Sequence, residues 1–285
     1  MSYTVPDSGS DPTSPAEVWS AAAKGWDDNA VEADGFTAGV TDALVAALAI
    51  PRGGNLLELA AGPGTLGPTW SELVGPEGSV ELSDIAPAMV EVATRRSRGI
   101  SNIATSVLDA GSIDRPDAHY DVVVCRMGLM FVPEPAQALS EIRRVLTPGG
   151  RLGALTWGGL GDNPWMTCVG MAVAAHGLIS ELPVGPGGPF SLSDPEQLAA
   201  LAEGAGFVDV VVDSRQLSFH STDVASHLAR VLALAGPLGA VVNAATEEQR
   251  AAVLSTASEL AAPYATAEGV TLPGQALSLV ATTPL

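Results

Sequence analysis

Short apolar runs alternate with amphipathic stretches along the middle of the chain. The apolar runs are β-branched or leucine-rich with little internal alternation, which is typical of strands covered on both faces. They predict strands at Asn55–Leu59, Ser79–Ser83, Ile103–Val107, Tyr120–Cys125 and Arg151–Trp157. The amphipathic stretches between them predict helices at Leu66–Val74, Pro87–Arg96 and Pro135–Leu146. Strand–helix–strand repetition of this kind predicts a parallel sheet with right-handed crossovers.

The start of the chain departs from this alternation. Residues 1–15 are polar, with Asp, Ser and Pro, and predict a disordered tail. Two helical patterns follow, at Ala16–Lys24 and at Phe36–Ala49. The second repeats apolar residues at the spacing of an amphipathic helix.

The alternation of predicted strands and helices changes again after Trp157. Helices are predicted at Trp165–His176, at Asp194–Ala205 with Ser193 as its cap, and two or three times within Thr222–Ala265. Further strands are predicted at Phe207–Asp213 and Gln275–Thr282. We therefore expect one domain over residues 16–285, with cap insertions at about 158–190 and 220–270 over one end of the sheet.

The balance of acidic and basic side chains restricts the classes of partner that we expect. The chain has 285 residues, 13 basic against 32 acidic side chains and a formal net charge of -19, and Lys24 is its only lysine. Nucleic acids and anionic membranes attract a basic face, so neither is expected as a partner. No apolar run approaches the roughly 20 residues of a membrane span and the start lacks a signal-peptide pattern, so we expect a cytoplasmic protein. Cys125, Cys168 and four histidines without HxxxH or HxH spacing predict no metal site.

The strongest local signal is a glycine-rich turn directly after the first predicted strand. The segment Leu56–Gly67 reads LLELAAGPGTLG, so a strand runs into the turn and a helix follows. Glycines let the backbone turn sharply and let a ligand approach main-chain atoms. In a doubly wound sheet such a turn lies at the carboxyl edge, where ligands bind.

Two kinds of ligand fit this turn. The glycines at 62, 64 and 67, with Asp84 ending the next strand, match a dinucleotide fingerprint. Glu58, four residues before the first glycine, would repel a pyrophosphate but suits a cationic ligand. Asp84 agrees with both, because a carboxylate accepts hydrogen bonds from the two ribose hydroxyls of either nucleoside. A nicotinamide cofactor therefore remains an alternative at this point.

Further motifs follow the turn in order. They are SDIAPAM at Ser83–Met89, VLDA at Val107–Ala110, YDVVVCR at Tyr120–Arg126 and EIRRVLTPGGRL at Glu141–Leu152. With the turn, they make residues 55–157 resemble the class I S-adenosylmethionine-dependent methyltransferases, in the branch of the ubiquinone and menaquinone biosynthesis methyltransferases. The resemblance implies an α/β, Rossmann-like fold: a doubly wound, mainly parallel seven-stranded sheet whose last strand is reversed. It also implies S-adenosylmethionine as cofactor.

The same resemblance implies residue roles around the methionine end of the cofactor. Glu58 would orient the ammonium group, directly or through a water, while main chain at Ala60, Gly62 and Gly64 lines it. A carboxylate at the end of a buried strand could be incidental, but an unpaired charge entering a core is costly.

At the nucleoside end, Asp84 would accept the ribose hydroxyls. Ile85 and Met89 would pack on the adenine faces, and Asp109 with Ala110 would meet the adenine edge. Structural alternatives are a helix cap for Asp84, a turn residue for Asp109 and ordinary core packing for Met89.

Arg126 and Met127 follow the fourth strand, where the family places the wall between cofactor and acceptor. Arg126 is assigned to the cofactor side and Met127 to the acceptor side. Trp26, in the first helical region, either closes over the cofactor or packs its helix against the sheet.

The acceptor pocket is expected where the chain leaves the fifth strand. Trp157, Asn163 and Trp165 lie in this stretch, and aromatic faces suit a flat, apolar acceptor. Trp165 has an equally good structural role as the anchor of the following helix.

Candidate bases are few. Methyl transfer is an in-line displacement at a sulfonium carbon, so the protein mainly aligns the reactants and excludes water, and only acceptors such as phenols need a base. His176, in the first cap helix, is the best candidate base. His220 and His227 are weaker ones, and His119 is expected to be exposed.

We therefore predict methyl transfer from S-adenosylmethionine to a small, apolar or aromatic molecule, on oxygen or carbon. An NAD(P)-dependent oxidoreductase and a non-methylating S-adenosylmethionine-binding protein or cyclase remain as alternatives. The expected partner is the small-molecule acceptor, and a homodimer stays open.

Overall fold

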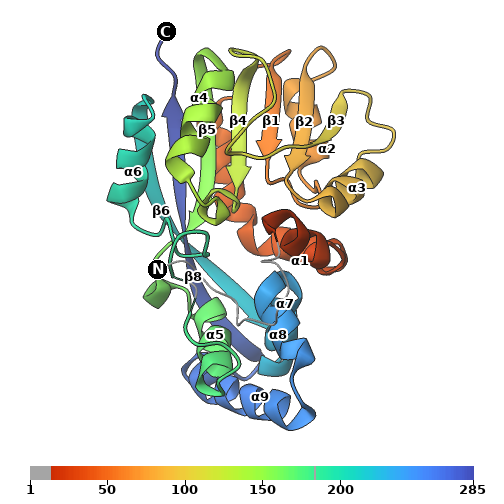
Figure 1. Cartoon of the computed structure of the whole chain (residues 1–285), viewed down its shortest axis with the longest axis vertical. Coiled ribbons are helices and arrows are strands. Elements are labelled where there is room, and N and C mark those ends of the chain that lie inside the picture. The colour runs from red at the N-terminus through yellow and green to blue at the C-terminus, as the bar shows by residue number, and fades with distance from the viewer. Residues whose placement is uncertain (1–13, 183) are drawn as a thin grey trace.

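The computed structural model describes residues 14–182 and 184–285 (Figure 1). Its centre is one sheet in the order β3-β2-β1-β4-β5-β8-β6, with the short β7 paired to β8. The strands are β1 (Asn55–Leu59), β2 (Ser79–Asp84), β3 (Ile103–Val107), β4 (Tyr120–Arg126), β5 (Leu146–Trp157), β6 (Val208–Ser221), β7 (Ala265–Thr266) and β8 (Gly269–Thr282). β1 to β5 pair in parallel, and β8 runs antiparallel between β5 and β6. The predicted α/β sheet with a reversed last strand is confirmed.

Helices cover both faces of this sheet. On the crossovers they are α2 (Gly67–Val74), α3 (Pro87–Arg96) and α4 (Pro135–Val145), with the 3-10 turn η1 (Leu129–Phe131) after β4. Apolar residues of β1 and β4 form the centre of the core, where Leu57 and Val123 have no exposed surface. These predicted strands and crossover helices are confirmed to within a few residues at their ends, apart from β5, which begins at Leu146 rather than at Arg151.

The N-terminal region is one helix, α1 (Pro15–Leu48), where the sequence predicted two. Ser14 caps it in a capping box with Glu17, so the last two residues of the predicted tail, Ser14 and Pro15, start this helix. The rest of that tail, residues 1–13, lies outside the described residues.

The acidic middle of α1 has no apolar periodicity, which is why the sequence suggested a break. Ion pairs to other elements hold it instead: Asp27 pairs with Arg95 and Arg96 of α3, and Asp34 pairs with Arg126 of β4. Tertiary contacts of this kind keep a helix continuous where intrinsic propensity is weak.

Beyond β5 the chain builds a cap at the carboxyl edge of the parallel strands (Figure 1). It contains the 3-10 turns η2 (Leu160–Asp162) and η3 (Ala262–Tyr264) and the helices α5 (Pro164–Ala175), α7 (Val224–Leu234), α8 (Gly236–Ala244) and α9 (Glu247–Ala261). β6 and β8 are each 14 residues long, twice the predicted length or nearly so, and extend past the sheet as a ribbon that carries these helices. The extra part of β6 is largely exposed and polar, so it lacks the apolar run that marks a buried strand.

α6 (Pro195–Gly204) returns the chain to the sheet. Asp194 caps it, because its carboxylate accepts the N–H groups of Glu196 and Gln197. The predicted cap, Ser193, is therefore wrong by one residue. Asp194 was the better candidate, because it directly precedes Pro195 at the first helical position.

Among the helices that the structure describes, none on its own has the length and apolar character to cross a membrane. α7 and α8 meet that criterion only as a pair, and the chain bends by 117° between them.

Candidate active site

The turn after β1 has a left-handed, close-packed backbone. Ala60, Gly62 and Gly64 all have positive φ angles, of 52°, 54° and 70°. A Cβ atom on Gly64 would lie 2.8 Å from the Cβ of Ala93 on α3, so only glycine lets the turn approach that helix. Ala60 is exposed and Gly62 half-buried, so the turn presents main chain to solvent at the carboxyl edge of the sheet.

Asp84, at the end of β2, holds this turn in place. One of its carboxylate oxygens accepts the N–H of Gly62 at 2.9 Å, and the other accepts the N–H of Ala86 at 2.9 Å. Burial raises the pKa of Asp84, and these backbone donors oppose that rise. Each carboxylate oxygen can accept a second hydrogen bond, so the group can bind further hydroxyl donors.

Glu58 is a buried carboxylate beneath the turn. It is 2 % exposed, and its Oε2 accepts the indole N–H of Trp70 at 2.7 Å. Burial raises the pKa of Glu58 to about 7, while the positive charge of Arg126 and the hydrogen bond from Trp70 oppose the rise. Sequence reasoning missed Trp70; its position on the helix after the turn was the available signal.

Arg126, at the end of β4, is bound to α1. Its two Nη atoms donate to the carboxylate of Asp34 at 2.7 Å and to the hydroxyl of Thr37 at 3.1 Å. The contact joins α1 to the edge of the sheet. Asp34 and Thr37 were not predicted, because nothing local in the sequence marks a partner so distant along the chain.

The next residues pack tightly against the glycine turn. Met127 has a positive φ of 57° and is half-buried. A Cβ atom on Gly128 would lie 2.3 Å from the Cβ of Ala60 and 3.1 Å from the Sγ of Cys125. The ends of β1 and β4 therefore meet at Gly128 without room for a side chain.

Replacing Gly128 by alanine is expected to destabilise the protein by about 1–3 kcal/mol, because overpacking forces two strand ends apart. Thermal unfolding of the two proteins measures this difference. Gly161→Ala is the matched control, since nothing lies within 4 Å of a Cβ atom at Gly161. Equal melting temperatures for Gly128→Ala and the wild type would contradict the close packing of these strand ends.

A small apolar cluster joins α1 to α3 beside Asp84. Met89 and Ala86 are buried in it, with Ala23 of α1, and Trp26 packs against them. The indole N–H of Trp26 donates to the carbonyl of Leu234 at 3.1 Å, so this tryptophan also ties α1 to α7. Met89 thus packs as a core residue, and Trp26 packs its helix against α3 and α7 rather than against the sheet.

Three other predicted residues lie at the open rim. Asp109 is exposed and its carboxylate accepts the N–H of Gly111 at 2.8 Å, which is the turn role foreseen for it. Ile85 and Ala110 are half-buried. With the turn and Met127, they bring the predicted cofactor residues to one edge of the sheet.

Asn163 does not line a pocket, which corrects the prediction. It is fully buried, its amide donates to the carbonyls of Gly158 and Gly159, and its oxygen accepts from Trp165 Nε1 and from the N–H of Gln275. Every hydrogen-bonding position of this side chain is therefore used to fix the start of α5.

Trp165 has the anchoring role as well. Its ring stacks on Phe219 with 4.1 Å between centroids, and Trp157 lies 4.9 Å away. Trp157 is 8 % exposed, so the three rings fill the space between β5 and the cap.

His176 is not at this edge, and its prediction as a base is wrong. It ends α5, and its Nε2 lies 2.8 Å from the hydroxyl of Thr256 on α9, within the cap. His220 contacts Thr271 on the ribbon, His227 is buried against the carbonyl of Trp165, and His119 precedes β4 at the opposite edge. No histidine of the described chain reaches the turn.

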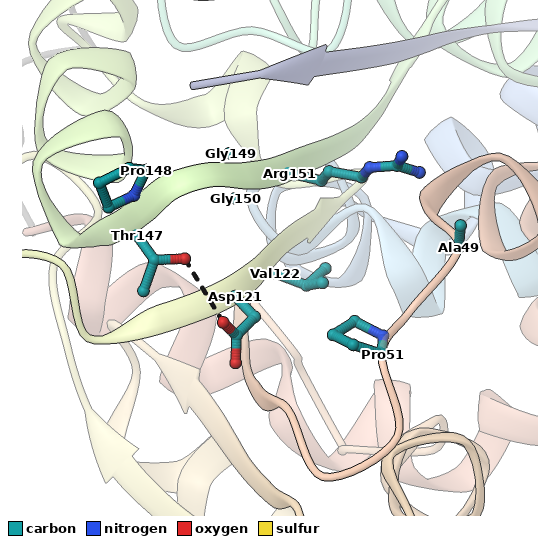
Figure 2. A pocket seen from close by; sticks show the side chains of 9 residues that line it. All are labelled: Ala49, Pro51, Asp121, Val122, Thr147, Pro148, Gly149, Gly150 and Arg151. Carbon is teal, nitrogen blue, oxygen red and sulfur yellow. Dashed lines mark hydrogen bonds between the residues drawn. The ribbon is translucent and has the colours of Figure 1, made fainter. Parts of the chain in front are cut away.

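Two cavities lie elsewhere. One, of about 200 Å³, is at the amino end of β4, where Asp121 accepts a hydrogen bond from Thr147 at 3.4 Å (Figure 2). The other, of about 510 Å³, is an apolar groove between α7, α8 and α9 lined by Leu228, Leu232 and Leu254. Neither is lined by residues of the glycine turn.

Residues 56–150 match the family described as methyltransferase domain. Over residues 56–150, this match together with the strand order and the acidic glycine turn identifies a class I S-adenosylmethionine-dependent methyltransferase domain.

Known proteins resemble this chain either over part of its sequence or in fold. Over 106 residues it is 40% identical to the ubiquinone/menaquinone biosynthesis C-methyltransferase UbiE of Pseudomonas putida (strain GB-1), which covers 36% of this chain and 41% of that one. The chain thus spans less than half the length of this curated relative. A presumed methyltransferase of Bacillus halodurans C-125 has a TM-score of 0.60 and 18% identity, covering 86% of this chain and 98% of its own. The [4+2]-cyclase SpnF has a TM-score of 0.53 and 22% identity, and the match covers 86% of this chain and 80% of the SpnF chain. These two likenesses show the fold.

Proposed function

We propose that this chain, acting as a single domain, transfers the methyl group of S-adenosylmethionine to a small, apolar or aromatic molecule. The observation that carries the proposal is the pair of buried carboxylates, Glu58 and Asp84, on either side of a glycine turn that is exposed at Ala60 and half-buried at Gly62. Arg126 and Trp70 only partly offset the burial of Glu58, Asp84 accepts only backbone N–H groups, and the turn itself contributes neither lysine nor arginine. The residues present therefore fit a cationic nucleoside better than a pyrophosphate.

Each end of such a ligand has partners at this edge. Asp84 would accept the ribose hydroxyls while it holds Gly62, and Glu58 would receive the ammonium group. Ile85 and Met89 would pack on adenine, with Asp109 and Ala110 at its edge.

The chain's contribution to the reaction is alignment. S-adenosylmethionine supplies a methyl group on a positively charged sulfur, and displacement at that carbon needs an acceptor held in line and water kept out. Trp19 of α1 and Phe131 of η1, edge to face at 4.8 Å, and the nearby Met127 provide apolar surface after β4. This surface supports an apolar acceptor.

No described histidine reaches the edge, and its carboxylates Glu58 and Asp84 are assigned to the cofactor, so we further propose that the acceptor needs no protein base. Its attacking atom would be a nucleophilic carbon, or an oxygen that ionises on its own. A proton released in the transfer would pass to solvent at the exposed rim.

The cyclase alternative has a specific observation behind it, namely the likeness to SpnF. It shares the expected cofactor site and differs in the chemistry at the acceptor. The nicotinamide alternative has no such support, and it leaves Glu58 unexplained.

Thermal unfolding with added ligand separates the three functions. A ligand that binds only the folded state at about 100 times its Kd stabilises it by about 2.7 kcal/mol, which is several degrees in melting temperature. We expect this rise with S-adenosylmethionine and S-adenosylhomocysteine and none with NAD. Formation of S-adenosylhomocysteine with a phenolic, enolic or quinol acceptor then supports methyl transfer. A rise with NAD alone would contradict the proposal, and cofactor binding without product across the acceptor panel would favour the cyclase.

A further inference from the structure

β6 is an unprotected edge of the sheet. It pairs with β8 on one side, and on the other it has no strand partner within residues 14–182 and 184–285. Residues 213–216 and 218 are all exposed, and Val211 is 52 % exposed. A long exposed edge offers unpaired N–H and C=O groups to another chain.

Both ends of this edge are closed, which limits the open part to a short segment. At one end, a bulge with Asp209 at a φ of 50° interrupts the register between Val208 and Val211. At the other end, the guanidinium of Arg230 donates hydrogen bonds to the carbonyl of His220 and to the hydroxyl of Ser221. The open edge is therefore residues 211–217.

This open edge is complementary to itself. In antiparallel pairing, two residues that face each other point their backbone N–H and C=O groups either both toward the partner strand or both away from it. The twofold axis of a strand that pairs with its own copy therefore passes through a residue and not between two residues. With Ser214 at the centre, Asp213 faces Arg215 of the copy, and the contact is repeated by symmetry. A twofold axis at Val212 would place Asp213 opposite Val211, and an axis at Gln216 would place it opposite Phe219. In either register both ion pairs are lost.

The rest of the segment agrees with this register. Side chains two residues apart share a face of a strand, so Val211, Asp213, Arg215 and Leu217 lie together. Centring on Ser214 sets Val211 opposite Leu217 of the copy at each end. Within one chain, Arg215 Nη2 lies 3.5 Å from Asp213 Oδ2. Both side chains are more than half exposed, so they are available for ion pairs with a second copy.

We propose that two copies of this chain associate through residues 211–217 of β6, antiparallel about a twofold axis at Ser214, and join their sheets into one. This isologous contact has two apolar pairs at its ends and two ion pairs at its centre. It is independent of the proposed methyl transfer, because none of these residues lies at the glycine turn.

Charge reversal tests the register. Asp213→Arg places like charges opposite each other at both positions, and so does Arg215→Asp. Each variant alone is expected to raise the dimer dissociation constant by about tenfold or more. A mixture of the two restores both ion pairs, so it is expected to form a heterodimer as stable as the wild-type dimer. The double variant Asp213→Arg/Arg215→Asp is likewise expected to dimerise.

Sedimentation velocity over a range of protein concentrations measures these species. Circular dichroism and the melting temperature report whether each variant is folded. A monomeric wild type at hundreds of micromolar would overturn the proposal. So would dimerisation that neither single variant weakens, or two folded monomeric variants that fail to associate when mixed while the wild type is dimeric.

Discussion

Asp84→Ala is expected to weaken the binding of S-adenosylmethionine by at least about a hundredfold. Two hydrogen bonds from ribose hydroxyls to a charged acceptor are lost, each worth about 1.5–3 kcal/mol. The N–H groups of Gly62 and Ala86 also lose their acceptor, so the turn is no longer held against β2. Isothermal calorimetry with S-adenosylmethionine and with S-adenosylhomocysteine measures the loss.

Asp121→Ala is the matched control for this variant. Asp121 also accepts a backbone N–H across neighbouring strands, from Asn55 at 2.8 Å, but it lies at the amino end of β4 beside the small cavity (Figure 2). Its removal is expected to cost stability without changing the cofactor affinity. If folded Asp84→Ala bound the cofactor as tightly as the wild type, the ribose assignment would be refuted.

Glu58→Gln is expected to weaken cofactor binding by about ten- to a hundredfold at pH 7.5, because a charge-assisted contact with the ammonium is lost. The amide oxygen can still accept from Trp70, so the local packing is kept. Calorimetry at several pH values measures the effect. The wild-type affinity should rise as pH increases from about 5 to 7, since burial raises the pKa of Glu58 to about 7 and the ammonium favours the carboxylate. Glu58→Gln should lack this rise.

The ligand-free protein should respond in the opposite direction. A carboxyl whose pKa is raised on folding makes the folded state less stable as pH rises from its unfolded value, 4.5, to its folded value near 7. At about 1.4 kcal/mol per pKa unit, Glu58→Gln should gain up to roughly 3 kcal/mol over the wild type at pH 8 without cofactor. Loss of stability together with unchanged binding would contradict the role of Glu58 as an ammonium partner.

The edge that carries the glycine turn could be predicted from the sequence because its signals are local. The turn from Ala60 to Gly64 is marked by its glycines, and Asp84 ends a strand of unmistakable pattern. Parallel strands bring their carboxyl ends to one edge, so the order of motifs along the chain already predicts which side chains gather there.

The cap could not be predicted in the same way, because long-range contacts determine it. Asn163 is polar in sequence, yet it is fully buried: besides its local partners Gly158 and Trp165, its oxygen accepts the N–H of Gln275 on the distant strand β8. His176 has no local mark that separates a base from a residue packed on α9. The continuity of α1 depends on Arg126 and on α3, neither of which its own pattern reveals.

A crystal structure of this chain with S-adenosylhomocysteine is the most direct test of the account. We predict the ribose hydroxyls within hydrogen-bonding distance of Asp84 and the amino-acid end between Glu58 and the main chain of Ala60 to Gly64. A nucleoside bound in the groove between α7, α8 and α9, or beside Asp121, with the glycine turn free of ligand, would contradict it.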